Sequence, residues 1–229
     1  MKNIKALTLG AAVAAALAGS MVSTSAVAGL SANLGIASQY YYRGAQQTTG
    51  AAAQAGVDYE HESGAYAGVW ASDVGGQSTT IGAAPGIETD YYFGYGGEMS
   101  GITYGVGYTL YTYTGDFDTQ YGEVNLTGAY GPVSLEFSTG THDGAGADAD
   151  DDYTFIALSY EYGSFTATYG TYGNDHDGAY LEIGFAKEIS ELDFGISLIN
   201  GDPDDSVTAT NATTDGTALV VTIGKTFDL

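Results

Sequence analysis

Apolar and polar residues alternate with a period of two along most of the chain. The pattern is clearest in the last thirteen residues, where one face carries Leu219, Val221, Ile223, Phe227 and Leu229. A period of two places successive side chains on opposite faces of a β-strand. The sequence ends inside this apolar strand, and an unpaired apolar edge promotes aggregation. We therefore predict that this strand closes a β-barrel, with the last strand of a soluble β-sandwich as the alternative.

Twelve segments with this alternation are predicted to be strands. They are Asn33–Arg43, Ala53–Glu60, Ala65–Asp73, Ile87–Gly96, Ile102–Leu110, Tyr121–Tyr130, Val133–Ser138, Tyr153–Tyr162, Phe165–Tyr172, Ala179–Lys187, Leu192–Ile199 and Thr217–Leu229. The connections after even-numbered segments are tight, whereas most of those after odd-numbered segments are longer and polar. Short turns at one end and long loops at the other are typical of outer-membrane barrels. The predicted fold is an all-β, transmembrane, antiparallel up-and-down barrel of about 12 strands.

The aromatic residues support the same fold. In the first segment, Tyr40 and Tyr42 continue the apolar face and Arg43 falls on the opposite face. In the third segment, the pattern does not decide which face is apolar. At the periplasmic end of the predicted strands we expect an interfacial girdle of rings, because membrane barrels carry amphipathic aromatics at that level. Its members are Tyr59, Tyr95, Tyr130, Tyr160, Phe165, Phe185, Phe194 and Phe227.

The first 28 residues have the features of a secretory signal peptide. Lys2 and Lys5 precede an apolar run over residues 6–18, and residues 26–28 form an Ala-x-Ala cleavage site. Residues 29–229 are then the barrel domain. The apolar run is too short for a membrane anchor, and no later segment holds 18 consecutive apolar residues, which excludes a helical membrane protein. The expected location is the cell outer membrane of a Gram-negative bacterium.

The chain is strongly acidic. Two of its five basic residues lie in the signal peptide, so Arg43, Lys187 and Lys225 face 28 carboxylates and the formal charge of the mature chain is about −25. This charge argues against nucleic acid and against anionic headgroups bound through a basic patch. An acid-rich surface suited to a salty habitat would also account for it. There is no cysteine, which excludes disulfides and thiol chemistry.

Three segments resemble the TorF family of porin-like proteins of proteobacteria. They are Ser38–Gly44 (SQYYYRG), Asp58–Val74 (DYEHESGAYAGVWASDV) and Ile87–Glu98 (IETDYYFGYGGE), and the likeness extends from the mature start to the final strand. The resemblance implies an outer-membrane barrel and supplies no catalytic residues. Separately, the spacing of Gly224, Phe227 and Leu229 resembles the C-terminal assembly signal of bacterial outer-membrane barrels.

The alternation points a set of charged side chains into the predicted barrel. They are Arg43, Asp58, Glu60, Glu88, Asp90, Glu123, Glu136, Glu182 and Asp193. Twelve strands about 4.8 Å apart and tilted by about 40° give a backbone radius of roughly 12 Å, so the lumen is narrow. Burying so many unpaired carboxylates is prohibitive, so we expect either water in the lumen or protonation of several of them.

These observations predict a porin-like channel for passive diffusion of small hydrophilic solutes, with a preference for cations. The alternative is a structural or adhesion barrel with a plugged lumen, in which Arg43 pairs with one of the acids. Expected partners are outer-membrane lipid and lipopolysaccharide, small solutes or ions, periplasmic chaperones and the barrel-assembly machinery, but no nucleic acid.

Neither catalysis nor a specific metal site is predicted. His61, His142 and His176 fall in predicted turns and loops, and no serine is held beside a base as a hydrolase requires. The acidic segments 144–152 and 174–178 offer oxygen ligands that suit Ca²⁺, but neither has the spacing of an EF-hand loop. No cofactor is expected.

Overall fold

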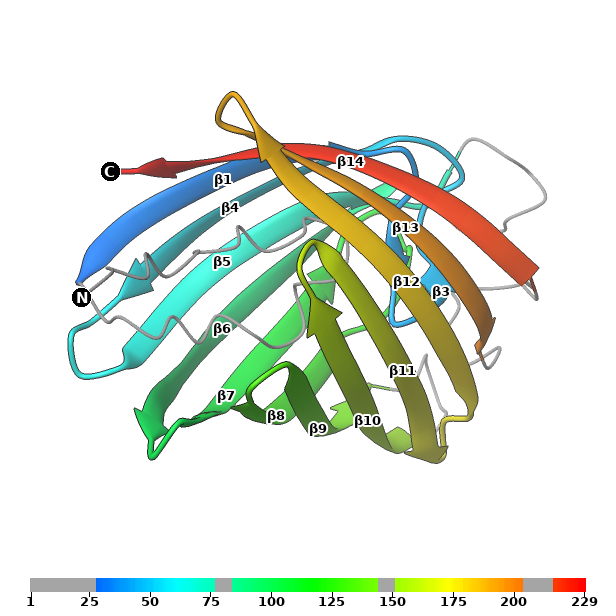
Figure 1. The fold of residues 1–229 in the computed structure, drawn as a ribbon. Helices are drawn as coiled ribbons and strands as arrows, with labels where there is room; N and C mark the ends of the chain where they lie inside the picture. The colour runs from blue at the N-terminus through cyan, green and yellow to red at the C-terminus, as the bar shows by residue number, and fades with distance from the viewer. Residues whose placement is uncertain (1–27, 77–83, 144–150, 204–215) are drawn as a thin grey trace.

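The computed structural model describes residues 28–76, 84–143, 151–203 and 216–229, and within these ranges it contains fourteen β-strands. Twelve of them close an antiparallel barrel (Figure 1). They are β1 (Gly29–Ala37), β4 (Ala52–Glu60), β5 (Ala65–Val74), β6 (Gly86–Met99), β7 (Ile102–Tyr113), β8 (Tyr121–Tyr130), β9 (Val133–His142), β10 (Asp151–Tyr162), β11 (Phe165–Asn174), β12 (Gly178–Ile189), β13 (Leu192–Pro203) and β14 (Gly216–Asp228). The predicted all-β barrel of 12 strands is confirmed.

The remaining strands, β2 (Tyr41–Tyr42) and β3 (Ala45–Gln46), pair only with each other. The predicted signal peptide lies outside the described residues, apart from Ala28. Within the described part of the chain, no helix is long and apolar enough to cross a membrane.

Strand β14 closes the barrel. It pairs with β1 on one side, where Asp228 faces Ser31, and with β13 on the other, where Gly224 faces Asp193. The start of β1 therefore lies beside the end of β14. At this end of the barrel, tight turns join β4 to β5, β6 to β7, β8 to β9, β10 to β11 and β12 to β13. We call this the turn end and the opposite end the loop end. Closure gives each barrel strand two neighbours and removes the exposed edge that an open sheet would have.

The outer face of the barrel is apolar. Outward side chains such as Ile36, Phe93 and Leu219 are about 60% exposed, while their sequence neighbours on the inner face are buried or partly buried. A soluble protein rarely exposes apolar residues on every strand, whereas a barrel in lipid does. The rings expected at the turn end are exposed or partly exposed there. The exposed members are Tyr59, Tyr95, Tyr130, Tyr160, Phe165, Phe185 and Phe227, and Phe194 is partly exposed.

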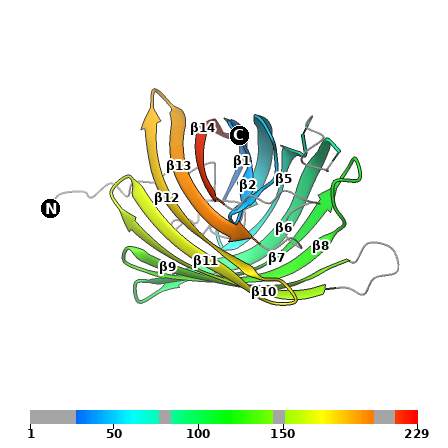
Figure 2. The same cartoon turned by 90° about the vertical axis from the view of Figure 1, so that its right-hand side faces the viewer.

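The first predicted strand is wrong beyond Ala37. The chain leaves the sheet there, and residues 38–50, which include β2 and β3 and which we call the inner hairpin, fold into the barrel (Figure 2). Tyr40 was expected on the outer face but is 5% exposed and packs edge-on against Trp70 at 5.6 Å between ring centroids. The alternation continues through the bend, so periodicity alone does not mark the point where the chain leaves the sheet.

Close packing holds the inner hairpin in place. The backbone nitrogen of Gln47 donates to the carbonyl oxygen of Tyr40 at 2.8 Å, and the backbone nitrogen of Tyr40 donates to Oγ1 of Thr48 at 2.8 Å. Gly44 has a φ of +86°, and a β-carbon there would lie 2.5 Å from the β-carbon of Tyr180 on β12. Glycine is the residue that tolerates both this backbone conformation and this contact.

Two clusters of buried, mainly aromatic side chains lie in the interior of the barrel. One cluster contains Tyr40, Ala52, Trp70, Val74 and Phe117, and the other contains Phe155, Ala157 and Tyr180. Trp70 also settles the facing of β5, because it points inward while Val69 is 37% exposed outside. Inward residues nearer the turn end, such as Tyr66 and Thr127, are only partly buried. The hairpin and its aromatic neighbours thus fill the loop half of the lumen more tightly than the turn half.

Candidate functional site in the barrel lumen

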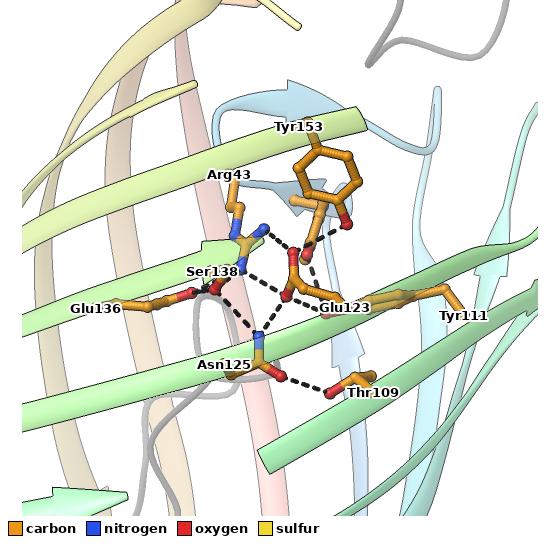
Figure 3. Close-up of polar contacts among 9 residues, drawn as sticks. Arg43, Thr109, Tyr111, Glu123, Asn125, Glu136, Ser138 and Tyr153 are labelled. Carbon is orange, nitrogen blue, oxygen red and sulfur yellow. Dashed lines mark hydrogen bonds and ion pairs between the residues drawn. The ribbon is translucent and has the colours of Figure 1, made fainter. Parts of the chain in front are cut away.

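Arg43, at the tip of the inner hairpin, is bound to the barrel wall (Figure 3). Its Nη1 donates to Oε2 of Glu123 at 2.6 Å, and its Nη2 donates to Oε1 of the same carboxylate at 3.0 Å. Nη2 also donates to Oε1 of Glu136 at 2.6 Å and to Oγ of Ser138 at 3.1 Å. Glu123 lies on β8, and Glu136 and Ser138 lie on β9. One guanidinium therefore joins the hairpin to two neighbouring wall strands.

Further hydrogen bonds fix the carboxylate of Glu123. The hydroxyl groups of Tyr153 and Tyr111 donate to its two oxygens at 3.0 and 3.3 Å, and Asn125 Nδ2 donates to Oε1. Asn125 is held in turn by Thr109, whose Oγ1 donates to the amide oxygen at 3.1 Å. We call Arg43, Glu123, Asn125, Glu136 and Ser138 the Arg43 cluster. Within the described residues Nε of Arg43 is buried without a hydrogen-bond partner, but the bonds to its two terminal nitrogens and to Glu123 offset part of the cost of burying these charges.

The electrostatics of Arg43 keep it charged. Arg43 lies in the inner hairpin, outside the twelve spanning strands. Burial lowers the pKa of its guanidinium, whereas the nearby carboxylates of Glu123 and Glu136 raise it. The pKa of Arg43 is therefore raised well above its ordinary value. The guanidinium also stacks over the ring of Phe155, with 3.9 Å between its central carbon and the ring centroid. One cation faces two acidic side chains, so Arg43 has no charge left to neutralise other groups in the lumen.

Two more carboxylates are buried on β6 without such compensation. Glu88 and Asp90 are each 1% exposed, and they point to the same side because they are two residues apart on a strand. The hydroxyl group of Tyr40 donates to Oε1 of Glu88 at 3.3 Å. Within the described residues, Oε2 of Glu88 and both carboxylate oxygens of Asp90 are buried with no hydrogen-bond partner. The sequence left two possibilities for these acids, water in the lumen or protonation of several of them, and at this level side chains enclose the pair.

The other predicted lining residues lie at different levels. Asp58 is 8% exposed and accepts hydrogen bonds from Tyr92 and, at 3.3 Å, from Nδ2 of Asn33. Glu182 is also buried, whereas Glu60 and Asp193 are partly exposed near the turn end. The predicted set therefore does not form one ring. The residues that lie together are the Arg43 cluster and the pair of Glu88 and Asp90.

The residues of the predicted assembly signal lie on or just after the closing strand. Gly224 is buried and faces Gly35 of β1, whereas Phe227 and Leu229 are 39% and 71% exposed. The backbone nitrogen of Leu229 donates to the carbonyl oxygen of Leu30 at 2.9 Å. Their role in assembly stays a prediction.

Sequence reasoning did not find the uncharged partners in the Arg43 cluster. Ser138, Asn125, Tyr111 and Tyr153 stand on inward positions of their strands, which the alternation indicates, but nothing in the sequence places them around Arg43. At the turn end, His61 contacts Ser63 at 2.9 Å, and the backbone nitrogen of Ser63 also donates to His61 at 3.1 Å. This pair is a local turn contact on an exposed surface.

The closed barrel and its acidic interior define a porin-like fold. A family model described as "Bacterial protein of unknown function (Gcw_chp)" matches residues 22–227, and the chain belongs to this family. A search of curated proteins gives no match. The TorF likeness remains a resemblance of the three segments quoted above.

Two solved structures share the architecture. KdgM porin has a TM-score of 0.54 at 10% identity, over 86% of this chain and 99% of that one. KdgM porin in complex with disordered oligogalacturonate has a TM-score of 0.51 at 10% identity, over 88% and 99%. At this identity the likeness shows the fold alone.

Proposed function

We propose that the protein is an outer-membrane channel through which small hydrophilic solutes diffuse, with a preference for cations. The apolar outer face and the closed barrel support a location in a bilayer, and the predicted signal peptide and C-terminal signal are consistent with export to the outer membrane. The resemblance to the TorF family points the same way.

The charge balance of the lumen carries this proposal. Among Arg and Lys residues of the described chain, only Arg43 reaches the interior, because Lys187 is exposed and Lys225 pairs with Glu191 at the turn end. Arg43 is already bound by two carboxylates. The buried oxygens of Glu88 and Asp90 therefore meet no fixed positive charge. Carboxylates in this situation favour a mobile cation or a proton over an anion.

The inner hairpin sets the narrowest level of the proposed pathway. It occupies the loop half of the lumen and is held to the wall through the tip residue Arg43. A pathway beside such a hairpin passes small solutes only. If the bonds between Arg43 and the wall are lost, the hairpin tip is free to move and the pathway becomes wider. The hairpin thus supplies the size limit, and the acids supply the charge preference.

The ligand of the KdgM complex is not carried over to this protein. Oligogalacturonate is a polyanion, and here it would meet buried carboxylates and one guanidinium that is already paired. Repulsion between like charges in a narrow, weakly polar lumen opposes its entry. Cations and uncharged hydrophilic solutes fit the lining better.

A specific observation favours a second candidate, a structural barrel with a closed lumen. Glu123 and Ser138 are 0% exposed, so side chains enclose these two members of the Arg43 cluster, although the side chain of Glu136 is 20% exposed. A barrel of this kind would present its loops outside the cell and conduct nothing.

Conductance in planar lipid bilayers separates the two candidates. The purified protein, shown to be folded by its heat-modifiable migration, is expected to give discrete conductance steps. Arg43→Met is expected to enlarge the steps, because it frees the hairpin tip, whereas Lys225→Met at the turn end leaves them unchanged. Folded protein that gives no steps, with or without Arg43, would reject the channel and support the closed barrel.

A further inference from the structure

Two imidazoles and a carboxylate converge at the loop end of the barrel. His142 ends β9, Asp151 begins β10, and His176 lies in the connection between β11 and β12. His142 and Asp151 are register partners on neighbouring antiparallel strands, so their side chains project from the same face of the sheet. One potential ligand atom from each of the three residues lies within 4.8 Å of the others. No residue of the Arg43 cluster takes part.

Aromatic rings hold both imidazoles in position. The ring of His142 stacks on Tyr121 with 3.9 Å between centroids and 2° between planes. The ring of His176 stacks on Tyr153 at 4.8 Å and 7°. Such stacking restricts rotation of the rings. Much of the conformational cost of assembling a binding site is therefore met by the fold itself.

The hydrogen bonds around His142 indicate which of its two ring nitrogens carries hydrogen. Oγ1 of Thr119 donates its one proton to the carbonyl oxygen of Asp143, so its contact with Nε2 of His142 at 2.6 Å is made as an acceptor. Oδ1 of Asp118, 3.1 Å from the same nitrogen, is also an acceptor. Nε2 therefore carries hydrogen, and the lone pair of neutral His142 is on Nδ1. A carboxylate that orients a histidine in this way is the usual outer partner of a histidine metal ligand.

Asp118 is itself held in place. The backbone nitrogen of Thr119 donates to its Oδ1 at 2.7 Å, and the hydroxyl group of Tyr121 donates to its Oδ2 at 2.8 Å. Tyr121 thus supports His142 twice, by stacking on the ring and by fixing its carboxylate partner.

We propose that His142, His176 and Asp151 bind one divalent transition-metal ion of the Zn²⁺ class at the loop end of the barrel. Two imidazoles and one carboxylate are a donor set that suits zinc and its neighbours, whereas Ca²⁺ prefers oxygen ligands alone. Ligand atoms around tetrahedral zinc lie roughly 3.3 Å apart, so small side-chain rotations bring atoms now within 4.8 Å into place. Three protein ligands leave a coordination position for water or a solute group.

This site has a structural consequence for the barrel mouth. A bound ion adds a link between the β9–β10 pair and the connection between β11 and β12, where the backbone nitrogen of Asp175 already donates to the carbonyl oxygen of Asp152 at 3.0 Å. The proposal rests on the positions of these side chains and does not depend on whether the lumen conducts.

Zinc binding by the folded protein tests the proposal. The probe is Zn²⁺ alone, offered to the protein without a histidine tag in detergent micelles, in competition with a chromophoric chelator. We expect one tightly bound Zn²⁺ per chain, with Ca²⁺ failing to displace it. His176→Gln and His142→Gln are expected to weaken binding by about 100-fold or more, and Asp118→Asn by about 10- to 100-fold through its loss as an orienting partner.

His61→Gln is the matched control, because it removes a histidine at the turn end and is expected to leave zinc affinity unchanged. Heat-modifiable migration shows that each variant is folded, and Asp151→Asn tests the same site without altering an imidazole. Equal zinc binding by the wild type and by the His142, His176 and Asp151 variants would assign the metal to surface carboxylates and overturn the proposal. Failure of the folded wild type to bind zinc would also overturn it.

Discussion

Arg43 and Glu123 form a two-pronged ion pair across the barrel lumen, at 2.6 and 3.0 Å, although 80 positions separate them in the sequence. Arg43 belongs to the inner hairpin and Glu123 to the wall, so the pair joins the hairpin to the barrel. Its side chains are 4% and 0% exposed. A buried pair of this kind adds little stability compared with apolar residues of the same size, but loss of one partner leaves a buried charge uncompensated.

We predict that Arg43→Met destabilises the folded protein by about 3–5 kcal/mol, because it leaves the buried Glu123 and the partly buried Glu136 without their cation. Urea unfolding followed by tryptophan fluorescence measures this loss, since the single tryptophan, Trp70, packs against Tyr40 of the inner hairpin. Lys225→Met is the control. Its pair with Glu191 is exposed and screened by solvent, so this substitution is expected to leave stability nearly unchanged.

A double-mutant cycle separates the ion pair from simple packing. In the Arg43→Met background, Glu123→Gln is expected to cost about 1–3 kcal/mol less than in the wild type, because the second substitution removes the stranded charge. If the two substitutions are additive to within about 0.5 kcal/mol, the pair does not anchor the hairpin.

Gly44 offers a test of the inner hairpin that changes no charge. Gly44→Ala places a β-carbon at a φ of +86° and against Tyr180, so we expect a loss of about 2 kcal/mol or more in the free energy of unfolding. Gly50→Ala is the control, because no atom lies within 4 Å of the added carbon, and it is expected to change stability by less than about 0.5 kcal/mol. Equal stability of the two variants would show that the hairpin does not pack against β12 in solution.

The closing strand is expected to be the segment most sensitive to truncation. Deletion of residues 227–229 removes Phe227 and Leu229 of the proposed assembly signal and the backbone hydrogen bond from Leu229 to Leu30. We expect unfolded, protease-sensitive protein in the periplasm, measured by cell fractionation and heat-modifiable migration. Normal amounts of folded barrel in the outer membrane after the deletion would show that these residues carry no signal.

Local periodicity predicted the strands but not the inner hairpin. Val221 and Ile223 were placed on the outer face correctly, because facing within one strand depends only on neighbouring residues. Tyr40 was misplaced, because a chain that bends out of the sheet can keep the same alternation. The contact of the bend with the wall decides its position, and that contact is not local.

The partners in the two sites depend on strand register and loop position. Arg43 was expected inside the barrel, and pairing with an acid was one of the alternatives. Its pairing with Glu123 and Glu136 depends on how far the inner hairpin extends across the lumen toward β8 and β9. The sequence likewise predicted loops for His142 and His176 without indicating that they meet, and for His142 that prediction is wrong, because this residue ends β9. Their approach requires the register of β9 against β10 and the fold of a connection further along the chain.

The reversal potential across a salt gradient tests the central claim most directly, because it reports the sign of the charge that the lumen selects. The wild-type channel in a planar bilayer is expected to prefer cations. The combined Glu88→Gln and Asp90→Asn substitutions are expected to reduce that preference, while Glu191→Gln on the exposed turn leaves it unchanged. Anion preference in the wild type, or a cation preference that the Glu88 and Asp90 substitutions do not alter, would contradict the assignment of these carboxylates to the conducting pathway.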